Sequence, residues 1–410
     1  MILFFLTSGL FLGWSLGAND ASNVFGSAVG TRMVSFRKAA IIASVFVILG
    51  AVAQGAGASD TLGELGGVNA IGGSFTLALA AAVTVYVMTK FSLPVSTTQA
   101  IVGAIIGWNL FTGNQTDSAT LSKIVITWIS GPILGGIFAI LLYILINKIK
   151  KASRIHLIRF ESYIKTGLII VGAFGAYSLG ANNIANVMGV FVPAFSLHDL
   201  NLGLFTLSSP QQLFLFGSIA IATGILTYSR RVMETVGGNI LELTAEAAMV
   251  VVLAQALVLF IFSSSALSNF LTGLGLPSIP LVPVSSSQVI VGCVMGIGLY
   301  KGARNINFKL IGEIAIGWIS TPLISGGLAF FSLFFMKNIF NIDVGHKILQ
   351  GESNTAQAIS TPEGLSSIFK YLLLAILGIS LAAMLYFYLI ERKKRIDLKK
   401  SEARFWKNLK

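Results

Sequence analysis

The stretch LGANDASNVFG at residues 16–26 recurs as LGANNIANVMG at residues 179–189. A second stretch, LPVSTTQAIVGAIIG at 93–107, recurs as VPVSSSQVIVGCVMG at 282–296. A third, WISGP at 128–132, recurs as WISTP at 318–322. The three pairs occur in the same order along the chain, so we predict two copies of one ancestral half.

The composition is that of a membrane protein. Of the 410 residues, 55% are hydrophobic and 11% are charged, against about 25% charged residues in an average soluble domain. The chain contains eleven apolar runs near the roughly 20 residues that a membrane-spanning helix needs. Two of them, at about 2–30 and 165–192, are interrupted by the polar motifs GANDASN and GANNIAN, and we expect the helices to break there.

The basic residues predict the orientation of the chain. If the N-terminus starts outside and each run crosses once, all of the 28 Lys and Arg residues except Lys123, Lys337, Lys347 and Lys370 fall on one side. The positive-inside rule assigns that side to the cytoplasm. We therefore expect a multi-pass protein of the plasma (inner) membrane with its N-terminus outside and its C-terminal tail in the cytoplasm. The net charge of +12 is explained by topology and does not indicate a nucleic-acid partner.

The two halves are predicted to be inverted. The first half contains an odd number of runs, so the second half enters the membrane from the opposite side. We expect an all-α polytopic membrane protein with two inverted-topology repeats, broken or re-entrant helices, and about 11–12 transmembrane segments. Its predicted parts are a first repeat (1–147), a basic cytoplasmic linker (148–164), a second repeat (165–336), an extracellular loop (337–365), a final transmembrane helix (366–391) and a basic cytoplasmic tail (392–410).

The repeated hydroxyl segments PVSTTQ and PVSSSQ predict anion-binding helix ends. Proline followed by Ser or Thr is typical of a helix N-terminus, where unpaired backbone N–H groups and the helix dipole attract an anion. Two such ends, related by inversion, could hold one oxyanion. The candidate anion ligands are Ser96, Thr97, Thr98, Gln99, Asn182, Ser285, Ser286, Ser287 and Gln288.

The motifs GANDASN and GANNIAN supply candidate cation ligands. A carboxylate inside a span is costly, so Asp20 is a functional candidate. Oxygen-rich side chains suit a hard cation such as sodium, and Asn23, Asn183 and Asn186 could share that role. Glu246 lies within an apolar run and is a further candidate for a proton or a cation. For Glu242 and Glu313 we favour a solvated, interfacial position.

Several other classes of site find no support in the sequence. The single cysteine, Cys293, excludes an intrachain disulfide, and the three histidines are far apart. Neither an HExxH nor a GxSxG motif is present. We expect neither an enzyme nor a cofactor, apart from transported coupling ions. A passive channel remains an alternative that counterflow measurements would test.

With these motifs in view, the chain resembles the inorganic phosphate transporter family, whose hallmark is a GANDVAN-type signature in each half. The resemblance implies import of inorganic phosphate by symport with cations, which are sodium in some members and protons or metal–phosphate complexes in others.

The resemblance places Asp20 at the signature aspartate and Asn183 at its second copy, where members often carry aspartate. It also places Asp60 and Glu246 near family glutamates, so Asp60 joins Glu246 among the candidate sodium ligands. We expect sodium-coupled phosphate import. The alternatives are another oxyanion such as sulfate, or coupling to protons or metal–phosphate. The expected partners are phosphate, sodium and lipid, and a homodimer is compatible with them.

Overall fold

A computed structural model describes residues 2–90, 95–153, 157–201, 206–230, 233, 243–302, 308–346 and 359–360. The helices are α1 (Ile2–Gly30), α2 (Phe36–Gln54), α3 (Ala56–Leu65), α4 (Ile71–Lys90), α5 (Thr97–Thr112), α6 (Ser118–Ser153), α7 (Leu157–Met188), the 3₁₀ helix η1 (Gly189–Phe191), α8 (Ser209–Thr227), α10 (Ala245–Ser263), α11 (Ser265–Gly273), α12 (Ser286–Tyr300) and α13 (Phe308–Asn338). Strand β1 (Phe195–Ser196) pairs in parallel with β4 (Ile359–Ser360), and β2 (Leu200–Asn201) pairs antiparallel with β3 (Thr206–Leu207).

The protein is an all-α polytopic membrane protein. Seven helices of the described part are long and apolar enough to cross a bilayer, namely α2, α4, α6, α7, α8, α10 and α13. The outermost of them expose apolar side chains where lipid would contact them, such as Ile133 on α6 and Leu323 on α13. The predicted final helix at 366–391, the tail, most of the 337–365 loop, Pro94 and Glu242 lie outside the described residues.

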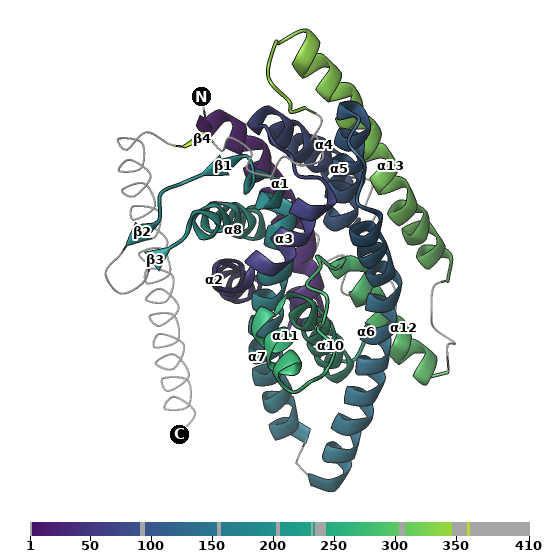
Figure 1. Cartoon of the computed structure of the whole chain (residues 1–410). Coiled ribbons are helices and arrows are strands. Elements are labelled where there is room, and N and C mark those ends of the chain that lie inside the picture. The colour runs from purple at the N-terminus through teal and green to yellow at the C-terminus, as the bar shows by residue number, and fades with distance from the viewer. Residues whose placement is uncertain are drawn as a thin grey trace, which may run out of the picture.

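The two halves pack in a two-fold pattern. Helix α1 packs on α8, and its repeat counterpart α7 packs on α2; likewise α5 packs on α13, and α12 packs on α6. In Figure 1, α6 descends from the region of α5 to the bottom of the view, whereas its counterpart α13 ascends from lower right to top. Counterpart helices that run in opposite directions are the arrangement that inverted repeats predict.

Repeated glycines allow the closest of these helix contacts. A methyl group on Gly103 of α5 would overlap the carbonyl oxygen of Pro322 in α13, and one on Gly292 of α12 would overlap the carbonyl oxygen of Pro132 in α6. Gly103 and Gly292 occupy equivalent positions of the second repeated stretch. Small residues let helix backbones approach closely in a membrane, where dispersion contacts stabilise association. The sequence repeat is therefore also a repeat of contacts.

The prediction that the signature motifs interrupt their helices is wrong. Helix α1 runs without a break through residues 17–23, and α7 does so through residues 180–186. Some of the polar side chains there form hydrogen bonds with residues of other segments, described below, and the helical backbone continues through both motifs. The interruptions lie elsewhere: α5 has 16 residues and α12 has 15, and at 1.5 Å per residue each is about 24 Å long or less, short of the roughly 30 Å hydrocarbon core.

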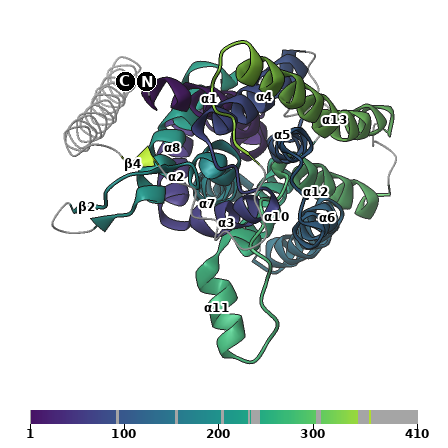
Figure 2. The same cartoon turned by 45° about the horizontal axis from the view of Figure 1, so that its top comes forward.

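One large hydrophobic core joins both halves of the described chain, beside a small second cluster around Leu200, Leu207 and Leu215. Its largest fully buried side chains include Trp108, Phe25, Phe191 and Phe214, which come from both repeats. Figure 2 shows α11 projecting away from the helices around this core. The two halves therefore do not fold as separate globules, and residues distant in sequence can meet in the buried interior.

Candidate functional site

Two helix N-termini are buried in the interior, as the hydroxyl segments predict. Ser96 caps α5, and its Oγ accepts a hydrogen bond from the backbone N–H of Gln99 at 3.2 Å. Ser285 caps α12 in the same way, accepting from the backbone N–H of Gln288 at 3.3 Å. The eight hydroxyl and amide side chains of the two segments are all buried: Ser96, Thr97, Thr98, Gln99, Ser285, Ser286, Ser287 and Gln288. Two helix ends with unpaired N–H groups are thereby placed away from solvent.

The carboxylate of Asp20 joins the first signature to the second hydroxyl segment. Asp20 lies on α1 and is 1% exposed. Its Oδ2 accepts a hydrogen bond from the Ser286 hydroxyl at 2.8 Å, and its Oδ1 accepts one from Asn19 Nδ2 at 3.0 Å. Ser286 is the first residue of α12. The carboxylate from one half therefore lies beside a helix N-terminus from the other half.

The second signature forms the reciprocal contact, with the first hydroxyl segment. Asn186 Nδ2 on α7 donates to Thr98 Oγ1 on α5 at 2.9 Å and to Asn183 Oδ1 at 3.0 Å. Asn182 Oδ1 accepts from the backbone N–H of Val284 at 3.0 Å, just before α12. These side chains are fully buried or nearly so. Each signature thus contacts the hydroxyl segment of the other repeat.

Asn183 makes the site unequal in its two halves. It is the repeat counterpart of Asp20, and Thr97 is the counterpart of Ser286. Asp20 and Ser286 are hydrogen-bonded, whereas Asn183 Nδ2 and Thr97 Oγ1 have no partner within the described part of the chain. The site therefore contains one carboxylate where a symmetric signature would supply two.

Other buried polar atoms of the same motifs are also unpaired among the described residues. They are Asn182 Nδ2, Asn186 Oδ1, Gln99 Oε1 and Gln288 Oε1. An unsatisfied buried polar group costs about 1–3 kcal/mol, and such atoms are normally paired with protein, water or ligand. The set contains both donors and acceptors, so it can interact with a cation as well as with an oxyanion.

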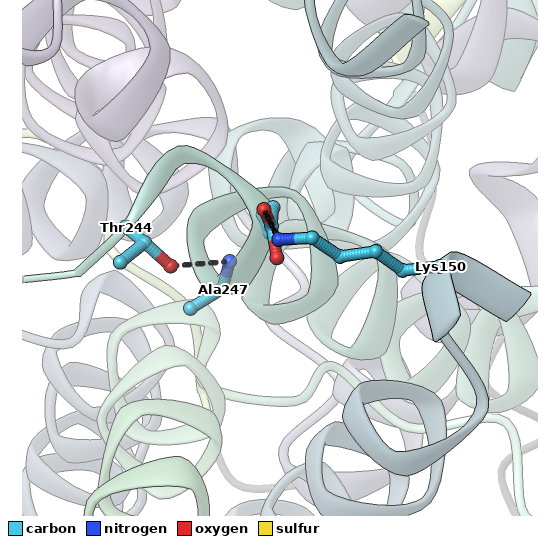
Figure 3. Close-up of polar contacts among 4 residues, drawn as sticks. Lys150, Thr244 and Ala247 are labelled. Atoms are coloured by element: carbon cyan, nitrogen blue, oxygen red, sulfur yellow. Dashed lines mark hydrogen bonds and ion pairs between the residues drawn. The ribbon is translucent and has the colours of Figure 1, made fainter. Parts of the chain in front are cut away.

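Asp60 and Glu246 are not part of this buried cluster. Asp60 is exposed on α3, with Glu64 as its charged neighbour. Glu246 lies in the first turn of α10, not deep within the span, and forms an ion pair with Lys150 of α6 (Figure 3). Thr244 caps the same helix end, accepting from the backbone N–H of Ala247 at 3.4 Å. The expectation that Glu246 lies deeper in its apolar run is corrected by this position at the start of α10, and its role as an ion ligand stays a prediction.

Two polar residues near the cluster were missed by the sequence analysis. Asn19 donates to Asp20 as described above, and Gln255 on α10 donates through Nε2 to the backbone oxygen of Ser286 at 3.4 Å. Gln255 is 1% exposed, and every other residue of α10 from Ala247 to Phe262 is apolar. A lone amide in a predicted span is the signal that could have identified it. Asn23 is also buried, at 8% exposure.

None of the described residues of the cluster has a basic side chain. Among the residues that the structure describes, no Lys or Arg is buried, and no group of three or more His, Cys, Asp and Glu residues could hold a metal ion. An anion at this site would be held by hydroxyls, amides and helix N-termini. A cation held beside it would offset the charge of Asp20.

Comparison with known proteins identifies the family. The sequence profile described as "Phosphate transporter family" matches residues 16–329 and therefore spans both signatures and both hydroxyl segments. The chain belongs to the phosphate transporter family. The chain is therefore a polytopic membrane transporter, and the resemblance of its repeated motifs to the inorganic phosphate transporters is confirmed.

Individual relatives agree with this assignment. The transporter is 27% identical to a protein of Pyrococcus furiosus named "Putative phosphate permease", over 80% of this chain and 94% of that protein. It is also 27% identical to a protein of the same name from Methanocaldococcus jannaschii, over 78% of this chain and 93% of that one. A solved structure titled "The sodium-dependent phosphate transporter" has the same fold, with a TM-score of 0.65 and 24% identity, over 82% of this chain and 99% of that chain.

Proposed function

We propose that this transporter imports inorganic phosphate by symport with sodium, through the cluster formed by the two signatures and the two hydroxyl segments. The observation that carries the proposal is the hydrogen bond between Asp20 and Ser286, which links a buried carboxylate to a buried helix N-terminus across the repeats. One cluster thus offers ligands of the two opposite kinds that co-transport requires.

The cation ligands are assigned to the signatures. Asp20 supplies the negative charge, and Asn23, Asn183 and Asn186 supply neutral oxygens, which are the ligands a hard cation prefers. The unpaired Oδ1 of Asn186 is available for this role. Asp60 and Glu246 are not assigned here, because one is exposed and the other is paired with Lys150.

The phosphate ligands are assigned to the two helix N-termini. Backbone N–H groups at the first turns of α5 and α12, together with the hydroxyls of Thr97, Thr98 and Ser287, can donate to phosphate oxygens. The unpaired Asn182 Nδ2 is a further donor. Protonated phosphate can also donate a hydrogen bond to an acceptor such as Asp20, whereas sulfate at neutral pH cannot, and this difference favours phosphate.

The coupling of phosphate transport to sodium follows from the order in which the two charged ions bind. A phosphate approaching the cluster alone would meet the carboxylate of Asp20, which repels it. Sodium bound beside Asp20 removes that repulsion, so phosphate binds after the cation. Movement of one repeat against the other would then expose the loaded site to the cytoplasm, in the manner of inverted-repeat transporters.

Uptake into proteoliposomes tests the proposal. The full chain would be reconstituted and supplied with radiolabelled phosphate under an inward gradient of sodium, of lithium or of protons in turn. We expect accumulation against a phosphate gradient with sodium, and no loss of uptake with sulfate in excess. If a proton gradient alone drives phosphate uptake as well as a sodium gradient does, protons and not sodium are the coupling ions. Complete competition by sulfate would overturn the phosphate assignment, and failure of counterflow exchange would favour a channel.

A further inference from the structure

A basic cavity lies apart from the Asp20 cluster, where the α1–α2 turn meets α7 and the end of α8. Its volume is about 460 Å³. It is lined by Val29, Arg32, Met33, Val34, Ser35, Phe36, Lys38, Lys165, Ile169 and Arg230. The lining thus combines an apolar wall with four cationic side chains.

The charge in this cavity is of one sign. Each charged residue that lines it, within the described part of the chain, is a Lys or an Arg. Arg32, Lys38 and Lys165 form no ion pair with any described carboxylate, and the guanidinium of Arg230 lies 5.9 Å from the ring centre of Phe36. Like charges gathered around one cavity repel one another, and a bound anion relieves that repulsion.

Arg32 is held in a backbone conformation that arginine rarely adopts. Its φ of 57° lies in the left-handed region, which is unfavourable for a residue with a Cβ and which glycine adopts freely. The strained turn directs the chain from α1 into α2 and places Arg32 at the cavity.

The start of α2 adds backbone donors to the same cavity. Ser35 is the N-cap of this 19-residue helix, and its side chain makes no capping hydrogen bond. The N–H groups of the first helical turn are therefore not satisfied by the cap, and the positive end of the helix dipole lies beside the four cations. Both features favour an anion with several acceptor oxygens.

We propose that this cavity binds a phosphate group, carried either by the headgroup of an anionic phospholipid or by free orthophosphate. Basic pockets between membrane helices are suited to such headgroups. The cavity lies at a basic turn between apolar helices, a position at the membrane boundary, and Val29, Val34 and Ile169 can contact the apolar part of a lipid. The proposal concerns a site separate from the transport cluster and does not depend on sodium coupling.

Thermal unfolding of the purified full chain in detergent tests the proposal. Three probes would be titrated: dioctanoyl phosphatidic acid, dioctanoyl phosphatidylcholine and inorganic phosphate. The variants are Arg32→Gly, which removes the charge and relieves the left-handed strain, and Lys165→Gln. The matched control is Arg37→Gln, an exposed cation close by in sequence that does not line the cavity.

We expect phosphatidic acid, but not phosphatidylcholine, to raise the unfolding temperature of the wild type and of Arg37→Gln. In Arg32→Gly and Lys165→Gln the phosphatidic acid concentration needed for half of this rise should increase about tenfold, as expected for the loss of one charge-assisted hydrogen bond. If inorganic phosphate gives the same cavity-dependent shift, free phosphate is the ligand. The proposal is overturned if Arg32→Gly and Lys165→Gln respond to both phosphate probes as Arg37→Gln does.

Discussion

Ser286, the first residue of α12, donates a hydrogen bond of 2.8 Å to the carboxylate of Asp20 on α1. These residues are 266 positions apart in the chain. The contact joins the signature of the first repeat to the hydroxyl segment of the second, and the Asn186 to Thr98 hydrogen bond makes the reciprocal connection. The proposed substrate ligands and the proposed ion ligands are therefore linked by direct contacts, and changes in one set should affect the other.

Asp20→Asn should leave the protein folded while weakening sodium coupling. The amide oxygen can still accept from Ser286, but the negative charge is lost. A hydrogen bond or contact to a charged group is worth about 1.5–3 kcal/mol, so the sodium concentration for half-maximal phosphate uptake should rise about tenfold or more. Proteoliposome uptake at varied sodium measures this. Glu313→Gln, which changes an exposed carboxylate in the same way, is the control. Unchanged sodium dependence in Asp20→Asn would remove that residue from the cation site.

Thr98→Val and Ser287→Ala should raise the phosphate KM. Both side chains are buried at the two helix N-termini, and each substitution removes a hydroxyl with little change of shape. Loss of one hydrogen bond worth about 0.5–1.5 kcal/mol corresponds to a roughly two- to tenfold increase in the phosphate KM. Thr84→Val is the matched control, because that buried hydroxyl donates to Ala80 O within its own helix. Equal KM values in all three variants would place the phosphate site elsewhere.

Gly103→Ala and Gly292→Ala should destabilise the protein to a similar degree. In each case the added methyl group overlaps a carbonyl oxygen of the facing helix, and overpacking of this kind costs about 1–3 kcal/mol. Unfolding temperatures in detergent measure the effect. Gly327→Ala on α13 meets no atom within 4 Å and should be neutral or slightly stabilising. A wild-type unfolding temperature for either of the first two variants would show that the close approach is not required.

The Lys150 to Glu246 ion pair should contribute little to stability. Lys150 is 41% exposed and Glu246 is 20% exposed, so solvent screens the attraction. A double-mutant cycle with Lys150→Gln and Glu246→Gln should give a coupling of about 0.2–1 kcal/mol in the free energy of unfolding, and high salt should reduce it. A loss of sodium-dependent uptake in Glu246→Gln as large as that in Asp20→Asn would show that Glu246 also participates in coupling.

Motifs of the sequence were sufficient to predict the membrane-spanning character, the two repeats and the buried helix N-termini at Ser96 and Ser285. These features depend on local patterns, namely apolar runs, repeated sequence motifs and the preference of serine for the N-cap position. The expectation of helix breaks at the signatures was wrong. Polar residues within an apolar run do not reveal whether residues of neighbouring helices can form hydrogen bonds with them. Gln255 was missed because it belongs to none of the repeated motifs, although a lone amide within an apolar run is itself a signal.

The sequence by itself determined which residues occupy equivalent positions in the two halves, because pairs such as Asp20 and Asn183, or Gly103 and Gly292, can be read from the repeats of one chain. Only the tertiary structure decided which residues are partners. Asp20 meets Ser286, Glu246 pairs with Lys150, and Arg32, Lys38, Lys165 and Arg230 line one cavity. Contacts between distant segments depend on how the helices of the two repeats pack. That packing results from many helix–helix contacts along the chain, and no single motif specifies all of them.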